Sequence, residues 1–353
     1  MKKTLKITSA LVGSMLAFGV SAAVAQTTVS GNLGLSYFAT KNTATANQSK
    51  TFRGFGKESQ INVQSKGKLS NGMDYAAGFS IEMDGADVTN ATAVNGSSIQ
   101  AQQSENTYID FISGNTTITI GADHIQNPDA HYANIVGFGY LSADGVNGVD
   151  SSMPQHKSPY SAYGAGIVQN IPGIGSLSFL YVPNFVNGQA VNDIGNAMTK
   201  AKTGDGESAK EIGFKGDFGV KGLEVMAFKS YSDSQVAGID NQGTTLAAKY
   251  NFGSFTIAAQ DINVEVESSG SAVTSKGRQY GVAYAVNKDF SVGYTYGKTT
   301  KTATTADEIL HRVAAGYNLG PVSVQVQYTD VGNQANAVNA DGQVLGVYLG
   351  TKF

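Results

Sequence analysis

The sequence has no cysteine, no tryptophan, only six prolines and few charges, and these shortages exclude several classes of protein. Without cysteine there is no disulfide scaffold, no cysteine-ligated metal domain and no lipoprotein attachment site. Charged residues make up 14% of the 353 residues, against about 25% in a typical soluble domain. The formal net charge is −3, which excludes a cationic nucleic-acid binder, so no nucleic-acid partner is expected.

The one long apolar run lies at the N-terminus. Residues 7–22 are uncharged and largely apolar, with Lys2, Lys3 and Lys6 before them and the small residues 23–25 after them. This pattern predicts a cleaved secretory signal over residues 1–25 and leaves residues 26–353 as one domain. After residue 25 no stretch approaches the roughly 18 apolar residues of a membrane helix. The rest of the chain is therefore either exported and soluble or crosses a membrane as a closed β-barrel.

Alternation of apolar and polar residues recurs along residues 26–353. It is clearest in residues 29–37, 75–83, 245–252 and 322–329. A period of two places alternate side chains on opposite faces of a sheet, so each segment is predicted to be a strand with one apolar and one polar face. No comparable helical period follows the signal, and the fold class is predicted to be all-β.

Short turns alternate with long polar connections between these segments. The seven short turns, rich in Gly and Asn, lie at 70–72, 113–115, 171–173, 221–222, 253–254, 287–289 and 319–320. The eight long connections lie near 40–51, 84–104, 123–158, 184–209, 233–242, 267–276, 301–308 and 332–342. Fifteen connections predict sixteen strands, and their sorting by length is typical of a transmembrane antiparallel β-barrel. Tyr37, Phe38, Tyr231 and Tyr296, near strand ends, are expected in its aromatic girdles.

The last strand and two early hairpins carry a family resemblance. Leu345, Val347, Leu349 and Phe353 share one strand face, and residues 59–83 followed by 105–123 resemble the Gram-negative general porins. The resemblance implies a sixteen-stranded barrel in the outer membrane, reached through the periplasm, with a long third loop folded into the pore. It also implies a homotrimer, contact with outer-membrane lipid and lipopolysaccharide, and recognition of Phe353 by the barrel assembly machinery.

The segment 123–158 is the predicted constriction loop. Its four aspartates are Asp123, Asp129, Asp144 and Asp150, and strand alternation adds Glu82 and Asp110 on the wall. Rings of such carboxylates select cations, so a mild cation preference is expected. The alternative is that these aspartates are solvated turn residues. The resemblance also implies a basic cluster facing the loop, for which Arg53, Lys66 and Arg312 are the candidates, unless each is simply a solvated side chain.

Three of the four histidines, His124, His131 and His156, also lie in this segment. Metal sites use closely spaced ligands on a rigid frame, so no transition-metal site is predicted. The aspartates leave a loosely held Ca²⁺ open, although no twelve-residue calcium loop is present. No other cofactor is expected.

The resemblance implies passive diffusion of small hydrophilic solutes and ions through a water-filled channel. Two alternatives stay open, a substrate-specific channel and a non-conducting structural or adhesive barrel. An outer-membrane enzyme is disfavoured because there is no G-x-S-x-G motif, and His311 is the one histidine outside the 123–158 segment.

Overall fold

The computed structural model describes residues 26–42, 50–82, 103–122, 124–125, 163–183, 185–186, 189–190, 208–233, 241–268, 271–302 and 304–353. The predicted signal over 1–25 lies outside these ranges. So does the 123–158 segment, apart from residues 124 and 125. The signal and the folding of that segment into the pore therefore stay predictions.

The described residues form eighteen strands and one short 3-10 helix. The strands are β1 (Gln26–Asn42), β2 (Lys50–Lys68), β3 (Asp74–Glu82), β4 (Gln103–Ser113), β5 (Thr116–Gly121), β6 (Gly164–Ile171), β7 (Gly175–Val182), β8 (Phe185–Val186), β9 (Gln189–Ala190), β10 (Ser208–Gly216), β11 (Leu223–Asp233), β12 (Asn241–Phe252), β13 (Phe255–Ser268), β14 (Ser271–Ala285), β15 (Phe290–Lys301), β16 (Glu308–Asn318), β17 (Val322–Gly332) and β18 (Gly342–Lys352). The 3-10 helix η2 (Gln334–Asn336) lies between β17 and β18. Among the described residues, no helix is long and apolar enough to cross a membrane.

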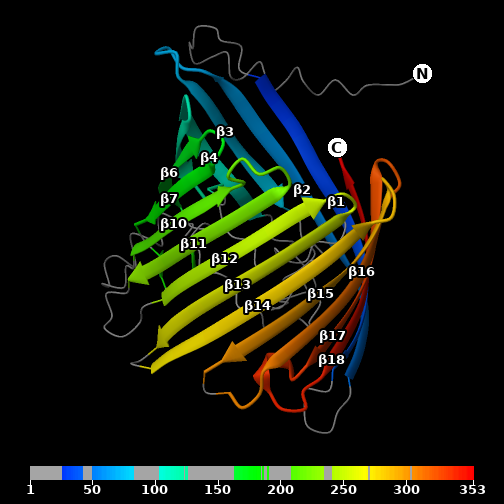
Figure 1. The fold of residues 1–353 in the computed structure, drawn as a ribbon. Coiled ribbons are helices and arrows are strands. Elements are labelled where there is room, and N and C mark those ends of the chain that lie inside the picture. Colours follow the sequence, from blue (N-terminus) through cyan, green and yellow to red (C-terminus); the bar gives the residue numbers. More distant parts are fainter. Residues whose placement is uncertain are drawn as a thin grey trace, which may run out of the picture.

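Sixteen of the strands close into one antiparallel barrel, which confirms the predicted fold class and strand number. Each barrel strand pairs with the strand before it and the strand after it, while β8 and β9 form a separate hairpin. The first strand pairs with the last, and Figure 1 shows β1, in blue, beside the red and orange strands of the C-terminus. Two backbone hydrogen bonds between Gly31 and Phe353, at 2.9 and 3.0 Å, extend this closing ladder to the final residue.

The alternation in the sequence sorts side chains between the two faces of the wall. Leu35, Leu246 and Val313 are 51%, 56% and 56% exposed, whereas their neighbours Ser36 and Arg312 are 5% and 8% exposed. Large apolar side chains thus cover the outside, and the inside combines polar side chains with several apolar clusters. This arrangement is the reverse of a soluble protein and the one that a barrel needs in lipid.

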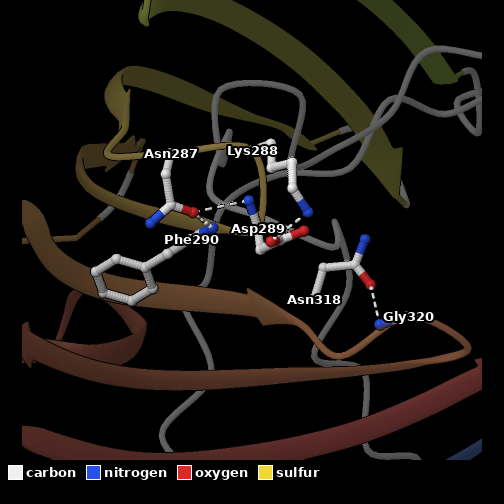
Figure 2. Close-up of polar contacts among 6 residues, drawn as sticks. All are labelled: Asn287, Lys288, Asp289, Phe290, Asn318 and Gly320. Atoms are coloured by element: carbon white, nitrogen blue, oxygen red, sulfur yellow. Dashed lines mark hydrogen bonds and ion pairs between the residues drawn. The ribbon is translucent and has the colours of Figure 1, made fainter.

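The short turns lie where the sequence predicts them, and Asn side chains close several of them. The Asn287 Oδ1 atom accepts hydrogen bonds from the backbone N–H groups of Asp289 and Phe290, both at 2.9 Å (Figure 2). In the turn between β16 and β17, the Asn318 Oδ1 atom accepts one from the Gly320 N–H at 3.2 Å. Gly320 has φ +85°, a left-handed conformation that glycine adopts at little cost.

Aromatic side chains form a row on the outside, near the short turns. Ring centroids of Tyr250 and Phe252 lie 5.8 Å apart, those of Phe252 and Phe255 5.8 Å, and those of Phe255 and Tyr284 4.8 Å. Such a row at a membrane interface is typical of outer-membrane barrels.

The expectation that Phe38 belongs to an outer girdle is wrong. Phe38 is 5% exposed and packs with Leu310, Val331 and Val344 in an apolar cluster. Its neighbours Tyr37 and Ala39 occupy the outward positions of β1, in register with Phe55 and Arg53 on β2. A phenylalanine one residue out of phase with the outward set therefore points inside.

Candidate functional site: the inner wall of the barrel

The inner wall is lined by buried polar side chains. Those exposed by 3% or less include Thr119 on β5, Thr245 on β12, Gln260 on β13, Gln279 on β14, Thr295 on β15, and Gln325 and Thr329 on β17. Most are uncharged, with both hydrogen-bond donors and acceptors. The described inner wall therefore has many polar side chains and scattered charges, interrupted by apolar clusters around Leu180, Met226 and Leu310.

Asp110 is the centre of a polar cluster on this wall. It lies on β4 opposite Thr119 of β5, and its side chain is 10% exposed. The Thr119 hydroxyl donates a hydrogen bond to Asp110 Oδ1 at 2.7 Å. The His124 Nε2 atom lies 2.9 Å from the other carboxylate oxygen, so both oxygens have partners. Strand alternation alone predicts the inward position of Asp110 but not these partners.

His124 also stacks on Tyr108. The two ring centroids are 3.3 Å apart, with an angle of 4° between the ring planes. Gln64 of β2 donates a hydrogen bond to the Tyr108 hydroxyl. Since His124 follows β5 by only three residues, this cluster fixes the start of the long connection against β2, β4 and β5.

Arg312 occupies an inward position on β16, as the alternation predicts. It is 8% exposed and is opposite Thr295 on β15 and Thr329 on β17. Its Nε atom donates a hydrogen bond to the Thr329 hydroxyl at 3.1 Å. The Gln327 side-chain amide donates to the same hydroxyl at 3.2 Å. The Thr329 hydroxyl thus helps to hold the guanidinium group on the inner wall.

Lys66 shares the inner face of β2 with Gln60 and Gln64. It is exposed and lies opposite Ala76 of β3, which is 4% exposed. In the barrel, β16 pairs with β15 and β17, whereas β2 pairs with β1 and β3. Lys66 and Arg312 therefore belong to different parts of the wall.

The strand register places Arg53 outside, so its assignment to the pore wall is wrong. Arg53 is exposed and lies opposite Ala39, in the same register set as Tyr37 and Phe55, and Phe55 is 86% exposed. Directly opposed residues of an antiparallel pair share a face, and that face is the outer one. Arg53 was proposed from the family resemblance, and counting the alternation back from Gln60 gives the correct face.

The other acidic candidates are only partly located. Glu82 ends β3 and lies opposite Gln60 of β2 in the ladder, but its side chain is outside the described part. The four loop aspartates, Asp123, Asp129, Asp144 and Asp150, lie outside the described residues. Their role at a constriction stays a prediction.

Sequence reasoning missed three further features. Lys215 of β10 and Lys249 of β12 lie on either side of Glu224 of β11, with their Nζ atoms 4.0 and 3.4 Å from its Oε1 atom. Thr119 and Tyr108 hold Asp110 and His124. Strand alternation predicts the inward position of Lys249, but its contact with Glu224 depends on which residues of β11 and β12 lie opposite each other.

The third missed feature is the connection between β17 and β18, which folds onto the wall. The Asn336 side-chain amide donates to the carbonyl oxygens of Thr299 and Ala306, at 2.7 and 3.1 Å. Glu308, 1% exposed, accepts a hydrogen bond from the Ala335 N–H at 2.7 Å. This connection reads as an ordinary polar loop in the sequence.

Two ion pairs outside the membrane-spanning part of the strands shift pKa values. A hydrogen bond from Lys298 lowers the pKa of Asp307, in the connection before β16. In the turn before β15, the carboxylate of Asp289 accepts a hydrogen bond from Lys288 at 2.7 Å and raises the pKa of that lysine (Figure 2). Asp307 and Lys288 therefore keep their charged forms over a wider pH range than free side chains.

Across the ranges that the structure describes, no group of three or more His, Asp or Glu side chains is arranged to hold a metal ion. His124 and Asp110 supply two such groups, and the nearest further side chains are the hydroxyls of Thr119 and Tyr108. The cluster is therefore built for hydrogen bonding.

Comparison with known proteins identifies the fold. A family model described as Gram-negative porin matches residues 9–336. The chain is similar to the anion-selective porin from Comamonas acidovorans, with a TM-score of 0.67, 12% identity, and coverage of 93% of this chain and 100% of that chain. It is also similar to the Vibrio cholerae outer membrane protein OmpT with loop L8 deleted, with a TM-score of 0.61, 13% identity, and coverage of 93% and 99%. A trimer form of in-vitro folded OmpT gives a TM-score of 0.58 at 11% identity, with coverage of 93% and 99%. A search of curated protein sequences finds no match.

Proposed function

Because the chain belongs to the Gram-negative porin family and forms an outer-membrane diffusion channel, we propose that small hydrophilic solutes and ions cross it passively, without a dedicated solute site. The observation that carries this proposal is the composition of the inner wall. Gln and Thr predominate among the buried polar side chains of β13 to β17, where Glu308 and Arg312 are the buried charged ones in the described residues. No row of aromatic or charged side chains runs along the inner face of the described part of these strands, which argues against a substrate-specific channel.

The ion preference is the finer part of the proposal. We propose that the aspartates of segment 123–158 give the channel a mild preference for cations, since rings of carboxylates in a narrow pore select them. We also propose that the same carboxylates can hold a Ca²⁺ ion loosely. Arg312, on the inner wall, would oppose the preference if it faced the constriction.

We propose that the chain has no catalytic activity. Its closest approach to a catalytic arrangement in the described residues is the cluster of Thr119, Asp110 and His124. There the Thr119 hydroxyl donates to the carboxylate and not to the histidine ring, so no base is placed to take its proton. The other described histidine, His311, is exposed on the outer face, with its Nδ1 atom 2.7 Å from the Tyr294 hydroxyl.

We propose a homotrimer as the working assembly, in line with the trimer form solved for OmpT of Vibrio cholerae. We also propose that the barrel contacts outer-membrane lipid and lipopolysaccharide, and that the barrel assembly machinery recognises it. Phe353 supports the last of these because its backbone hydrogen bonds to Gly31 place it where β18 meets β1.

The test is single-channel recording from refolded protein (residues 26–353) in a planar bilayer under a KCl gradient. Conductance steps in groups of three are expected, with a reversal potential of cationic sign. The triple variant Asp129→Asn, Asp144→Asn, Asp150→Asn should conduct with a reversal potential closer to zero. Folded protein that gives no conductance would refute the channel, and an unchanged reversal potential in the variant would remove these aspartates from the constriction.

A further inference from the structure

The connection between β17 and β18 crosses a neighbouring strand at the long-connection end of the barrel. The Asn336 side-chain amide, on η2, donates to the carbonyl oxygens of Thr299, near the end of β15, and of Ala306, before β16, at 2.7 and 3.1 Å. The Asn333 side-chain amide donates to the carbonyl oxygen of Asp307 at 3.2 Å. A connection that starts on β17 thus reaches β15, although β16 lies between these two strands.

The connection lies on the inner side of the wall. Glu308 shares its face of β16 with Leu310 and Arg312, both of which point inside, and it is 1% exposed. Its Oε2 atom accepts a hydrogen bond from the backbone N–H of Ala335 at 2.7 Å. Because the acceptor is an inward side chain, η2 lies toward the lumen and not toward the lipid-facing surface.

The inner wall beside this connection is covered. An apolar cluster on the inner face of β1, β16, β17 and β18 is at most 8% exposed, and its members are Phe38, Leu310, Val331 and Val344. Asn336 and Ala340, within the connection, are each 3% exposed. Apolar side chains are stabilised when they leave water, so such a cluster favours a packed layer on its lumen side. The connection is in the right place to contribute to that layer.

The backbone of the connection is shaped for this position. Asn333, Ala335, Asn336 and Asn339 have φ between +52° and +61°, in the left-handed region. Alanine rarely adopts this conformation, because its Cβ approaches the following carbonyl oxygen. Ala335 is also the residue whose N–H group reaches Glu308. An unfavourable conformation at a contact with the wall indicates a segment that the surrounding structure holds in one place.

We propose that the β17–β18 connection narrows the outer mouth of the channel and so limits the size of the solutes that enter. Asn336 and Glu308 are its positioning residues, since their hydrogen bonds hold it against β15 and β16. The long connections of such barrels face the cell exterior, which places this narrowing at the outer entrance. The inference rests on the passive diffusion proposed above, and the narrowing is separate from segment 123–158.

The first test releases the connection with one substitution. Asn336→Gly removes both amide hydrogen bonds, and glycine tolerates the left-handed backbone at this position. Two ordinary hydrogen bonds correspond to about a thirtyfold shift toward the released connection, so amide hydrogens of residues 333–341 should exchange about thirtyfold faster by mass spectrometry. The matched control is Asn339→Gly, an exposed asparagine of the same connection with φ +60°. Its exchange should change by less than about twofold, as for an ordinary surface substitution.

The second test removes the connection. In a hairpin variant, Asn-Gly replaces residues 332–341, because Val331 and Gly342 lie opposite each other and a two-residue turn can join them. Swelling of vesicles that contain each folded protein measures the entry of a pentose, a disaccharide and a trisaccharide. The hairpin variant and Asn336→Gly should admit the trisaccharide faster than the unmodified protein and Asn339→Gly do. Entry of the pentose should stay the same in all four proteins.

Two outcomes would overturn the proposal. Equal entry of the trisaccharide through the unmodified protein and the hairpin variant would show that the connection does not limit solute size. Unchanged hydrogen exchange in Asn336→Gly would show that this side chain does not hold the connection. Gel mobility of unheated samples confirms folding, and the hairpin variant keeps the size test valid if Asn336→Gly does not fold. Entry of no sugar through the unmodified protein would refute the channel itself, whereas pentose entry without a size effect would refute the narrowing alone.

Discussion

Removing the partners of Asp110 tests whether the polar cluster holds the wall together. Thr119→Val keeps the shape of the side chain and removes the hydroxyl that donates to Asp110 at 2.7 Å. His124→Phe keeps a ring to stack on Tyr108 and removes the nitrogen 2.9 Å from the other carboxylate oxygen. The two variants together leave the carboxylate, 10% exposed, without either contact.

The expected costs follow from burial. A hydrogen bond to a charged group contributes about 1.5–3 kcal/mol, so Thr119→Val should lower the free energy of unfolding by that amount. The His124 side chain is 31% exposed, and screening by water should hold the cost of His124→Phe near the lower limit, about 1.5 kcal/mol. The double variant should lose about 3–5 kcal/mol because a buried charge is left without a partner. Adding Asp110→Leu to it should restore part of the loss.

The assay is equilibrium unfolding in urea in phospholipid vesicles. Because the chain has no tryptophan, far-UV circular dichroism and the gel mobility of unheated samples report the folded fraction. Changes below about 0.5 kcal/mol in both single variants, the range of ordinary surface substitutions, would refute the reasoning. A triple variant less stable than the double would show that Asp110 contributes without its two partners.

Two further predictions concern close packing and pH. Gly121→Ala should lower the yield of folded barrel, since an added Cβ would lie 2.3 Å from the carbonyl oxygen of Thr107. The control Gly54→Ala should refold normally, because no atom lies within 4 Å of the added Cβ. Equal yields of the two variants on gels of unheated samples would contradict this prediction. Asp307→Asn should lower the melting temperature slightly at neutral pH, because the hydrogen bond from Lys298 lowers the pKa of Asp307 and so stabilises the fold above the unfolded-state pKa of about 3.9. That contribution is lost as the pH falls through the lower folded-state pKa. Calorimetry should therefore find equal melting temperatures for the variant and the unmodified protein in strong acid. A difference in melting temperature that persists there would contradict the assignment to the charge of Asp307.

The fold could be predicted from the sequence because two local signals agree along the whole chain. Alternation fixes which residues face out, and Gly-Asn turns fix where the strands reverse, so the count of sixteen needs no long-range information. The same alternation predicts the inward positions of Asp110, Lys66 and Arg312. Counted from Gln60, the alternation also gives the outward position of Arg53. Counted from Tyr37, it gives the inward position of Phe38.

The contacts within the site could not be predicted in this way. Asp110 meets Thr119 because the turn between β4 and β5 sets that register, and it meets His124 because the chain folds back after β5. Nothing in the residue types distinguishes these partners from the many other Thr side chains or from the three other His side chains.

The pairing of the first strand with the last restricts how this protein can change in evolution. Because β1 and β18 run antiparallel, the number of wall strands must be even. Gain or loss of one strand would force a parallel pair at the closing ladder and reverse the direction of every later strand. New segments can therefore enter only as whole hairpins or as longer connections. Lineages of this barrel should differ in the length of the eight long connections far more readily than in the circumference of the wall.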